Sequence, residues 1–303
     1  MKKWIRNLLQ RYGYDIVKTG RPYVPETRHD LQVRVGAFSL RMPGFNPQAT
    51  NYRIYPDLNA AFGRLAVAVA GAYPNMWLID VGANVGDTIA VVRSKVQVPI
   101  IAIEGDAATF RYLESNAALF PDVKRICTFL GEHTTRIRAR SEKRGWNTTI
   151  IPDPSGTETL MIRTLDEVLQ AEGLSALPVK LLKVDVEGFD TIVLRGALDT
   201  IRCHHPVLFF EYNRNNMKAI GEDGLPTLFS LRDLGYDRAG FFDHQGTLMA
   251  VSRLLQDEVV RSLHRYISAP RNLAGYYDIC LFHEADSRLA DTYFESEMAL
   301  QEG

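Results

Sequence analysis

The stretch LIDVGANVGDT at residues 78–88 contains an apolar run followed by two glycines. Its apolar beginning predicts a buried strand over Met76–Val81, and the residues after it predict a helix over Thr88–Val96. Gly82 and Gly86 lie in the turn between the two elements. Glycine adopts backbone angles that other residues avoid and allows close approach of a ligand. Because free N–H groups at the helix start also face this crevice, we expect a nucleotide-like ligand at the carboxyl end of the strand.

Outward from this turn, apolar runs alternate with helical patterns along most of the chain. The runs predict six further strands, at Pro99–Glu104, Val123–Gly131, Val179–Asp185, Pro206–Tyr212, Tyr236–Phe242 and Tyr277–His283. Helical patterns separate them, the last at Ser252–Ile267. Apolar strands that alternate with helices predict an α/β fold with a doubly wound, mostly parallel, seven-stranded sheet.

The chain divides into three predicted parts: an N-terminal extension (1–56), a main domain (57–285) and a polar C-terminal tail (286–303). Alternation over Leu31–Met42 predicts a β-hairpin in the extension, placed as a cap over the site. The first residues, Met1–Tyr14, combine an apolar helical face with basic residues. Packing of this helix onto the domain is the preferred interpretation, and peripheral contact with a membrane surface is the alternative.

Composition excludes several classes of protein. Lysine and arginine total 35 against 36 aspartates and glutamates, which disfavours a nucleic-acid-binding protein. The three cysteines have no metal-binding spacing and indicate a reducing, cytoplasmic location. There is no apolar run long enough to cross a bilayer and no secretory signal.

Charge at the start of the helix distinguishes between nucleotide cofactors. A dinucleotide fingerprint has three glycines and places a pyrophosphate on the helix N-terminus. Here two glycines are followed by Asp87, which would repel a pyrophosphate and suits a ligand with an ammonium and a sulfonium, such as S-adenosylmethionine (SAM). Glu104 ends the next strand, where a carboxylate can accept hydrogen bonds from ribose hydroxyls.

A second group of polar residues follows the strand predicted at Val179–Asp185. Residues 183–190 read KVDVEGFD, and Glu211 and Asn213 end the next predicted strand. Since the carboxyl ends of parallel strands meet at one edge of a sheet, we expect these carboxylates beside the glycine turn.

These runs resemble the FkbM family of SAM-dependent methyltransferases. The matching runs occur in the family's order, at residues 79–86 (IDVGANVG), 102–104 (AIE), 164–167 (TLDE), 183–188 (KVDVEG), 193–197 (VLRGA) and 206–211 (PVLFFE). The resemblance covers roughly Trp77 to Asn213. It implies a Rossmann-like class I methyltransferase fold and O-methylation of a hydroxyl on a sugar, glycan or secondary metabolite.

Two sets of residues are the candidates for this chemistry. The expected catalytic groups, which would orient or deprotonate the acceptor, are Asp185, Glu187, Glu211 and His133. The expected cofactor-binding residues are Asp80, Gly82, Asn84, Gly86, Asp87, Thr88, Glu104, Gly105, Asp106, Gly131, Glu132 and Asp185.

Several alternatives remain open from the sequence. Asp185, Glu211 and Asn213 carry oxygen ligands that Mg²⁺ accepts, although we predict no metal. The basic stretch Arg136–Trp146 is expected to be a solvated face, the alternative being a wall for an anionic acceptor such as a phosphorylated sugar. The competing functions are a nicotinamide-dependent oxidoreductase and a non-catalytic SAM-binding protein.

Overall fold

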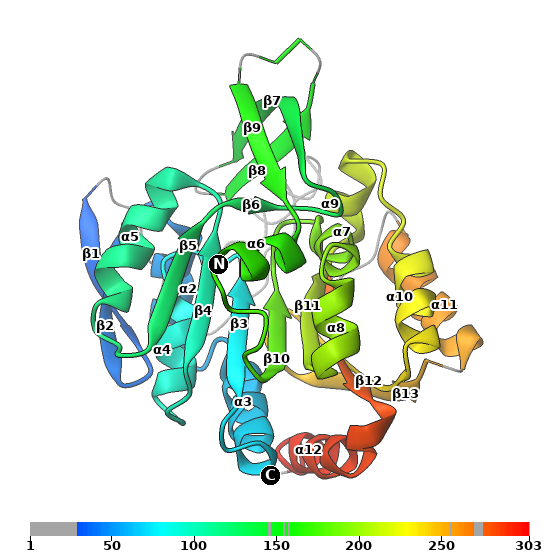
Figure 1. The fold of residues 1–303 in the computed structure, drawn as a ribbon. Helices are drawn as coiled ribbons and strands as arrows, with labels where there is room; N and C mark the ends of the chain where they lie inside the picture. Colours follow the sequence, from blue (N-terminus) through cyan, green and yellow to red (C-terminus); the bar gives the residue numbers. More distant parts are fainter. Residues whose placement is uncertain are drawn as a thin grey trace, which may run out of the picture.

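An eight-stranded sheet forms the centre of the computed structural model (Figure 1). The structure describes residues 29–144, 147–153, 155–156, 158–254, 256–269 and 275–302. In spatial order the strands are β13 (Leu248–Arg253), β12 (Tyr236–Phe242), β14 (Tyr277–His283), β11 (Val207–Tyr212), β10 (Val179–Val184), β3 (Trp77–Val81), β4 (Ile100–Glu104) and β5 (Val123–Cys127). The strands from β11 to β5 are parallel, and β14 is antiparallel to β11. The predicted doubly wound, mostly parallel sheet is confirmed.

The expected number of seven strands is wrong by one, because β13 adds an edge strand. Our helix over Ser252–Ile267 began too early: β13 takes residues up to Arg253, and α11 is Asp257–Ser268. The cause is a tight turn after β12. The Asp243 carboxylate accepts hydrogen bonds from the N–H groups of Gln245 and Thr247, which turns the chain back along β12.

Helices cover both faces of the sheet, and each face has its own apolar core. Side chains alternate along the strands, so Leu78 belongs to one core and its neighbour Ile79 to the other. The first core is completed by α3 (Ala60–Ala72), α4 (Asp87–Arg93), α5 (Ala107–Ala117) and α12 (Ser287–Ala299). The second is completed by α6 (Leu165–Ala171), α7 (Asp190–Arg195), α8 (Leu198–His204), α10 (Leu225–Asp233) and α11. A short helix, α9 (Arg214–Ala219), follows β11.

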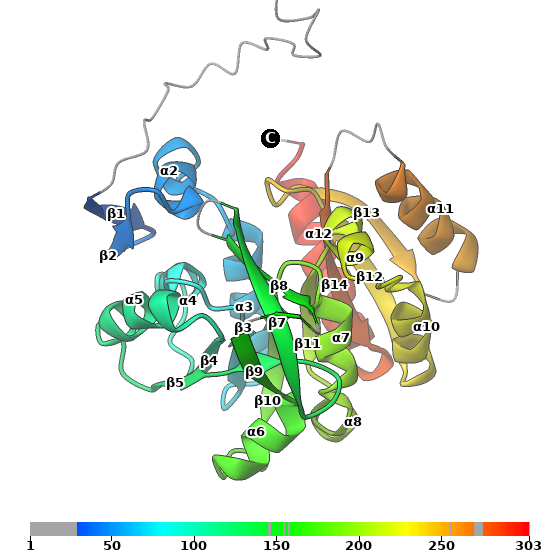
Figure 2. The same ribbon diagram turned by 90° about the horizontal axis from the view of Figure 1, so that it is seen from above.

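A second sheet stands above the carboxyl ends of the central strands (Figures 1 and 2). Its order is β6 (Phe129–Leu130), β9 (Glu158–Arg163), β7 (Thr135–Arg144) and β8 (Asn147–Pro152). The basic stretch that we expected to be a solvated face thus begins in β7. Strand alternation puts Ile137 toward the cavity described below and leaves Arg136 and Arg138 exposed.

Both ends of the described chain pack on the main domain. The predicted hairpin is confirmed as β1 (Asp30–Val35) and β2 (Phe38–Pro43), and it is followed by a helix that we did not predict, α2 (Pro47–Ile54). The expected polar tail is instead mostly helix α12. Ala290, Tyr293 and Phe294 are spaced three or four positions apart, so they share one face of this helix, and that face is buried. Glu297 on the same face accepts two hydrogen bonds of 2.6 Å from Arg64 in α3.

The predicted amphipathic helix at residues 1–14 lies outside the described residues. Among the residues that are described, no helix combines the length and the apolar character needed to cross a bilayer.

Candidate active site

The turn between β3 and α4 holds both glycines in the left-handed region, with φ of 79° at Gly82 and 87° at Gly86. A Cβ at Gly82 would lie 1.9 Å from the backbone oxygen of Asp185. The Asp185 N–H in turn donates to the Val81 carbonyl at 3.0 Å. We expected a ligand to need the space beside Gly82, but the end of β10 occupies it. The glycine therefore brings the Asp185 segment against the turn.

A cavity of about 1240 Å³ opens at this edge of the sheet. Pockets for one small ligand usually measure roughly 300–1,000 Å³, so two ligands have room here. The expected site residues that line it are Gly82, Asn84, Asp87, Thr88, Glu104, Gly105, Asp106, Gly131, Glu132, His133, Asp185, Glu187 and Glu211. Asp80 and Gly86 lie behind the cavity wall.

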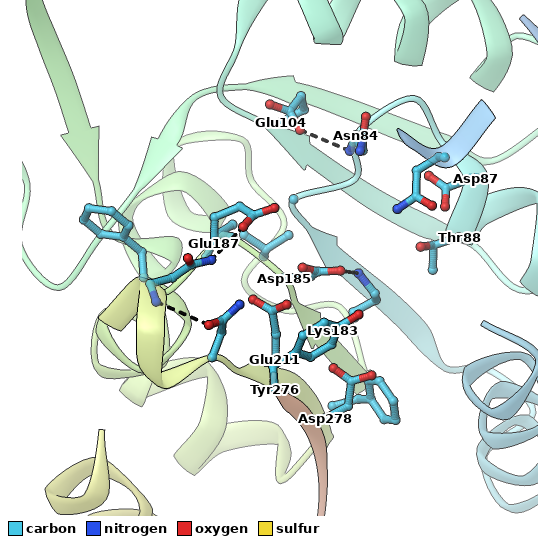
Figure 3. Close-up of a pocket in the computed structure, with 18 of the residues that line it drawn as sticks. Asn84, Asp87, Thr88, Glu104, Lys183, Asp185, Glu187, Glu211, Tyr276 and Asp278 are labelled. Atoms are coloured by element: carbon cyan, nitrogen blue, oxygen red, sulfur yellow. Dashed lines mark hydrogen bonds and ion pairs between the residues drawn. The ribbon is translucent and has the colours of Figure 1, made fainter. Parts of the chain in front are cut away.

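Glu104 ends β4 with its carboxylate held by the backbone. One oxygen accepts from the Asp106 N–H at 2.8 Å, and the other accepts from the Asn84 N–H at 3.1 Å (Figure 3). Burial raises the pKa of Glu104 to about 7, against the lowering effect of these bonds. Each oxygen keeps a second lone pair, so the carboxylate can still accept hydrogen bonds from a ligand.

Lys183 connects two carboxylates beneath the glycine turn. Its ammonium lies 3.6 Å from the fully buried Asp80 and 3.0 Å from Asp185. Although burial opposes it, attraction to Asp185 and Asp80 raises the pKa of Lys183 above its ordinary value. Neither oxygen of Asp80 has a hydrogen-bond partner among the described residues, so Lys183 supplies its countercharge. The Asp185 side chain is 48% exposed and faces the cavity.

Asp87 is engaged by the N-terminal extension. The Tyr52 hydroxyl donates to the Asp87 carboxylate at 3.0 Å, and the Asn59 amide donates to the Tyr52 oxygen at 2.9 Å. Burial raises the pKa of Asp87 to about 6, while Lys183 and the Tyr52 hydroxyl act in the opposite direction. The extension thus contributes to the cavity wall through α2, and Asn59 joins it from the start of the main domain.

Replacing Tyr52 with phenylalanine should lower the free energy of unfolding by about 1 kcal/mol, because it removes one hydrogen bond to a buried carboxylate. Urea unfolding measures the loss, with Tyr266→Phe at an exposed position as the matched control. Equal stability of the two variants would show that the Tyr52–Asp87 contact does not hold the extension in place.

Acidic side chains cover the wall formed by β11 and β14. Glu211 is only 8% exposed, and its Oε2 atom has no hydrogen-bond partner among the described residues. Asp278 lies opposite Glu211 across the two strands, and both line the cavity. Asn213 also lines it, but its side-chain oxygen caps α9. No group of three or more histidine, cysteine, aspartate or glutamate side chains in the described ranges is arranged to hold a metal ion.

The turn after β10 is held by Asp190 rather than by the two carboxylates that precede it. Asp190 accepts from the N–H groups of Val186 and Gly188 at 3.1 and 3.0 Å. Glu187 lies in the left-handed region and accepts from the Asn216 amide at 2.8 Å. Glu187 is therefore anchored to α9, whereas Asp185 faces the cavity and is paired with Lys183 (Figure 3).

The residues after β6 differ most from expectation: Gly131 and Glu132 were predicted to bind the cofactor, and His133 was a candidate catalytic group. Glu132 forms an ion pair with Arg195 at 2.7 Å, so its carboxylate is already occupied. The His133 side chain is 81% exposed at the rim. A Cβ at Gly131 would lie 2.7 Å from the Ile162 side chain, which makes this glycine a packing position.

Sequence reasoning missed three residues of the site: Tyr52, Asn59 and Asp278. Tyr52 lies in a segment with no strong periodic pattern and Asn59 lies at the start of a predicted helix over Asp57–Ala72, and only the folded chain places them at Asp87. Asp278 did carry a signal, because it is a charge within the otherwise apolar predicted strand Tyr277–His283.

The family of the chain follows from a comparison with family models. A model described as the Methyltransferase FkbM domain matches residues 80–238, just over half of the chain. The chain belongs to the FkbM methyltransferase family. The predicted family is thereby confirmed, and the fold is that of a class I methyltransferase.

Solved structures similar to this FkbM chain are distant. A methyltransferase FkbM from Methylobacillus flagellatus KT is 21% identical over 45% of this chain and 32% of its own, with a TM-score of 0.31. This chain thus spans about a third of that protein. The N-terminal domain of human METTL16 is 10% identical over 82% of this chain and 76% of its own, with a TM-score of 0.41. A putative caffeoyl-CoA O-methyltransferase from Staphylococcus aureus is 11% identical over 72% and 82%, with a TM-score of 0.38. Among curated proteins none matches.

Proposed function

We propose that this protein transfers a methyl group from SAM to a hydroxyl of a sugar, glycan or secondary metabolite, with Asp185 as the base. The observation that carries the proposal is the position of Asp185. Its carboxylate is half exposed to a cavity with room for two ligands, and its backbone is fixed against the glycine turn.

The cavity fits SAM in its chemistry. Glu104 offers a carboxylate for the ribose hydroxyls, and Phe129 and Leu130 give an apolar wall for an aromatic base. Nine carboxylate residues and a single lysine are found among the described residues lining the cavity, a balance that favours a cationic ligand. When bound, SAM supplies a methyl group made electrophilic by the positive sulfonium.

Asp185 would accept the proton of the acceptor hydroxyl, and the ammonium of Lys183 would hold the Asp185 carboxylate in place. Glu211 is a less suitable base, because burial and the nearby Asp185 raise its pKa well above the ordinary value and so favour its protonated form. His133 and Glu187 are less suitable, since one is exposed at the rim and the other is bonded to Asn216.

The proposal is tested by incubating the protein with methyl-labelled SAM and a panel of sugars, glycans and polyketide alcohols. We expect label in an ether on at least one class of acceptor. Tight SAM binding without transfer to any member would favour a non-catalytic SAM-binding protein instead.

Replacing Glu104 with glutamine should weaken binding of S-adenosylhomocysteine about tenfold, the loss of roughly one charge-assisted hydrogen bond. Because a deprotonated carboxylate accepts more hydrogen bonds and the pKa of Glu104 is about 7, wild-type affinity should rise from pH 6 to pH 8. Calorimetric titration measures both effects, with Glu114→Gln on the exposed face of α5 as the control. If the affinity for S-adenosylhomocysteine does not change with pH and is the same in Glu104→Gln as in Glu114→Gln, a ribose contact at Glu104 is contradicted.

A further inference from the structure

We propose that Glu211 and Asp278 form the acceptor subsite and that they bind a protonated amino group of the acceptor. This inference rests on the proposed function and adds the chemical class of the substrate, an amino alcohol or amino sugar.

The two carboxyl groups are placed side by side by the register of the sheet. Glu211 and Asp278 are Cα partners on the antiparallel strands β11 and β14, where opposite side chains point to the same face. Both line the cavity, on the wall that also carries Asp185 and Tyr276 (Figure 3). Like charges directly opposite each other destabilise a strand pair. The repulsion in a pair of this kind is relieved either by bound protons or by a cationic partner.

The described chain supplies no cation for this pair. The nearest lysine, Lys183, has its ammonium at Asp185 and Asp80. No ion pair of the described residues includes Glu211 or Asp278, and the Oε2 atom of the 92% buried Glu211 has no hydrogen-bond partner there. The Glu211 side chain thus lines the cavity with one carboxyl oxygen exchanging no hydrogen bond with the described part of the protein, a polar group that a ligand can satisfy.

The pKa values of Glu211 and Asp278 are both raised, as expected for two neighbouring carboxyl groups with no cation paired to them among the described residues. Burial, followed by repulsion from Asp185, Asp190, Glu187 and Asp278, raises the pKa of Glu211 well above its usual range. Burial and Asp185 raise the pKa of Asp278 to about 8, with Lys183 lowering it and Asp243 adding to the rise. At pH 7, below the pKa of Asp278, the pair carries at least one proton, and a cation that binds there should release it.

An ammonium is the ligand that suits these groups best. It donates three hydrogen bonds and carries the charge that the pair lacks. A phosphorylated acceptor would meet the acidic wall, because Arg136 and Arg138 are on the other face of β7. A metal ion would need a ligand set that the described residues do not form.

The test uses pairs of hydroxyl compounds that differ only in one amino group, each as the free amine and as the N-acetyl derivative, starting with glucosamine and N-acetylglucosamine. The full chain is first saturated with S-adenosylhomocysteine, whose own amino group then fills any subsite meant for the donor. Binding of each compound is titrated at pH 7 in two buffers of different ionisation enthalpy, which gives the number of protons released.

We expect at least one free amine to bind about tenfold more tightly than its N-acetyl partner and to release protons. Glu211→Gln and Asp278→Asn should abolish both effects. Asp57→Asn, which removes one charge from another part of the cavity lining, should keep them.

Two results would overturn the inference. In the first, no free amine binds more tightly than its N-acetyl derivative, which includes the case that neither compound binds. In the second, a preference for the amine persists in both Glu211→Gln and Asp278→Asn. If Glu211→Gln weakens S-adenosylhomocysteine itself and no amine preference exists, the pair serves the donor. Failure of S-adenosylhomocysteine to bind the wild type at all would instead refute the proposed function.

Discussion

Replacing Lys183 with methionine should lower the free energy of unfolding by about 3–5 kcal/mol, the cost of leaving a buried charge without its partner. Asp80 is fully buried, and its oxygens have no hydrogen-bond partner among the described residues. Burial raises the pKa of Asp80, and the Lys183 ammonium, 3.6 Å away, is the countercharge that lowers it again. Methionine fills a similar volume, so the loss would report charge rather than packing.

Urea unfolding measures this loss, with Lys124→Met on the exposed face of β5 as the control. A double variant, Asp80→Asn with Lys183→Met, should recover much of the stability because both members of the buried ion pair are then neutral. If Lys183→Met is as stable as the Lys124→Met control, Asp80 is not stabilised by Lys183.

Replacing Asp185 with asparagine should slow single-turnover methyl transfer by roughly 10²- to 10⁴-fold, the usual contribution of a general base. Asparagine has the same shape, but it cannot take the proton of the acceptor hydroxyl. Binding of S-adenosylhomocysteine should change little, because the backbone of residue 185 still packs on Gly82. Rapid-quench measurement with the acceptor found in the labelled panel separates the chemical step from binding.

Two other variants provide a scale for that measurement. His133→Ala changes an exposed rim side chain and should leave the rate nearly unchanged. Asp199→Asn changes a surface carboxylate paired with Arg202 and is the matched charge control. A rate for Asp185→Asn equal to that of Asp199→Asn would exclude Asp185 as the base and move attention to Glu211.

The local pattern of the sequence carries most of the fold. Apolar runs between helical patterns predicted seven central strands, since fully buried parallel strands are apolar on both faces. The pattern failed where side-chain bonding decides the structure. The turn at Asp243 reverses the chain so that β13 can pair with β12. Helix α12 forms in a mostly polar segment because a few apolar residues on one face pack against the domain.

The candidate site was predictable where it follows strand ends and unpredictable where distant segments meet. Glu104 and Asp185 could be placed because the ends of parallel strands share one edge. The ion pair between Glu132 and Arg195 joins residues that are 63 positions apart in the sequence. The hydrogen bond from Tyr52 to Asp87 joins residues that are 35 positions apart. No periodicity reports such contacts, so Glu132 and Asp87 appeared free for a ligand.

The proposed function requires that the cavity at the ends of β3, β4 and β10 binds SAM through Glu104. Isothermal titration of the wild-type chain with S-adenosylhomocysteine, and separately with NAD, tests it most directly. We predict one S-adenosylhomocysteine site per chain, displaced by SAM and weakened about tenfold by Glu104→Gln, and no heat with NAD. Binding of NAD, or an S-adenosylhomocysteine affinity that Glu104→Gln leaves unchanged, would contradict it.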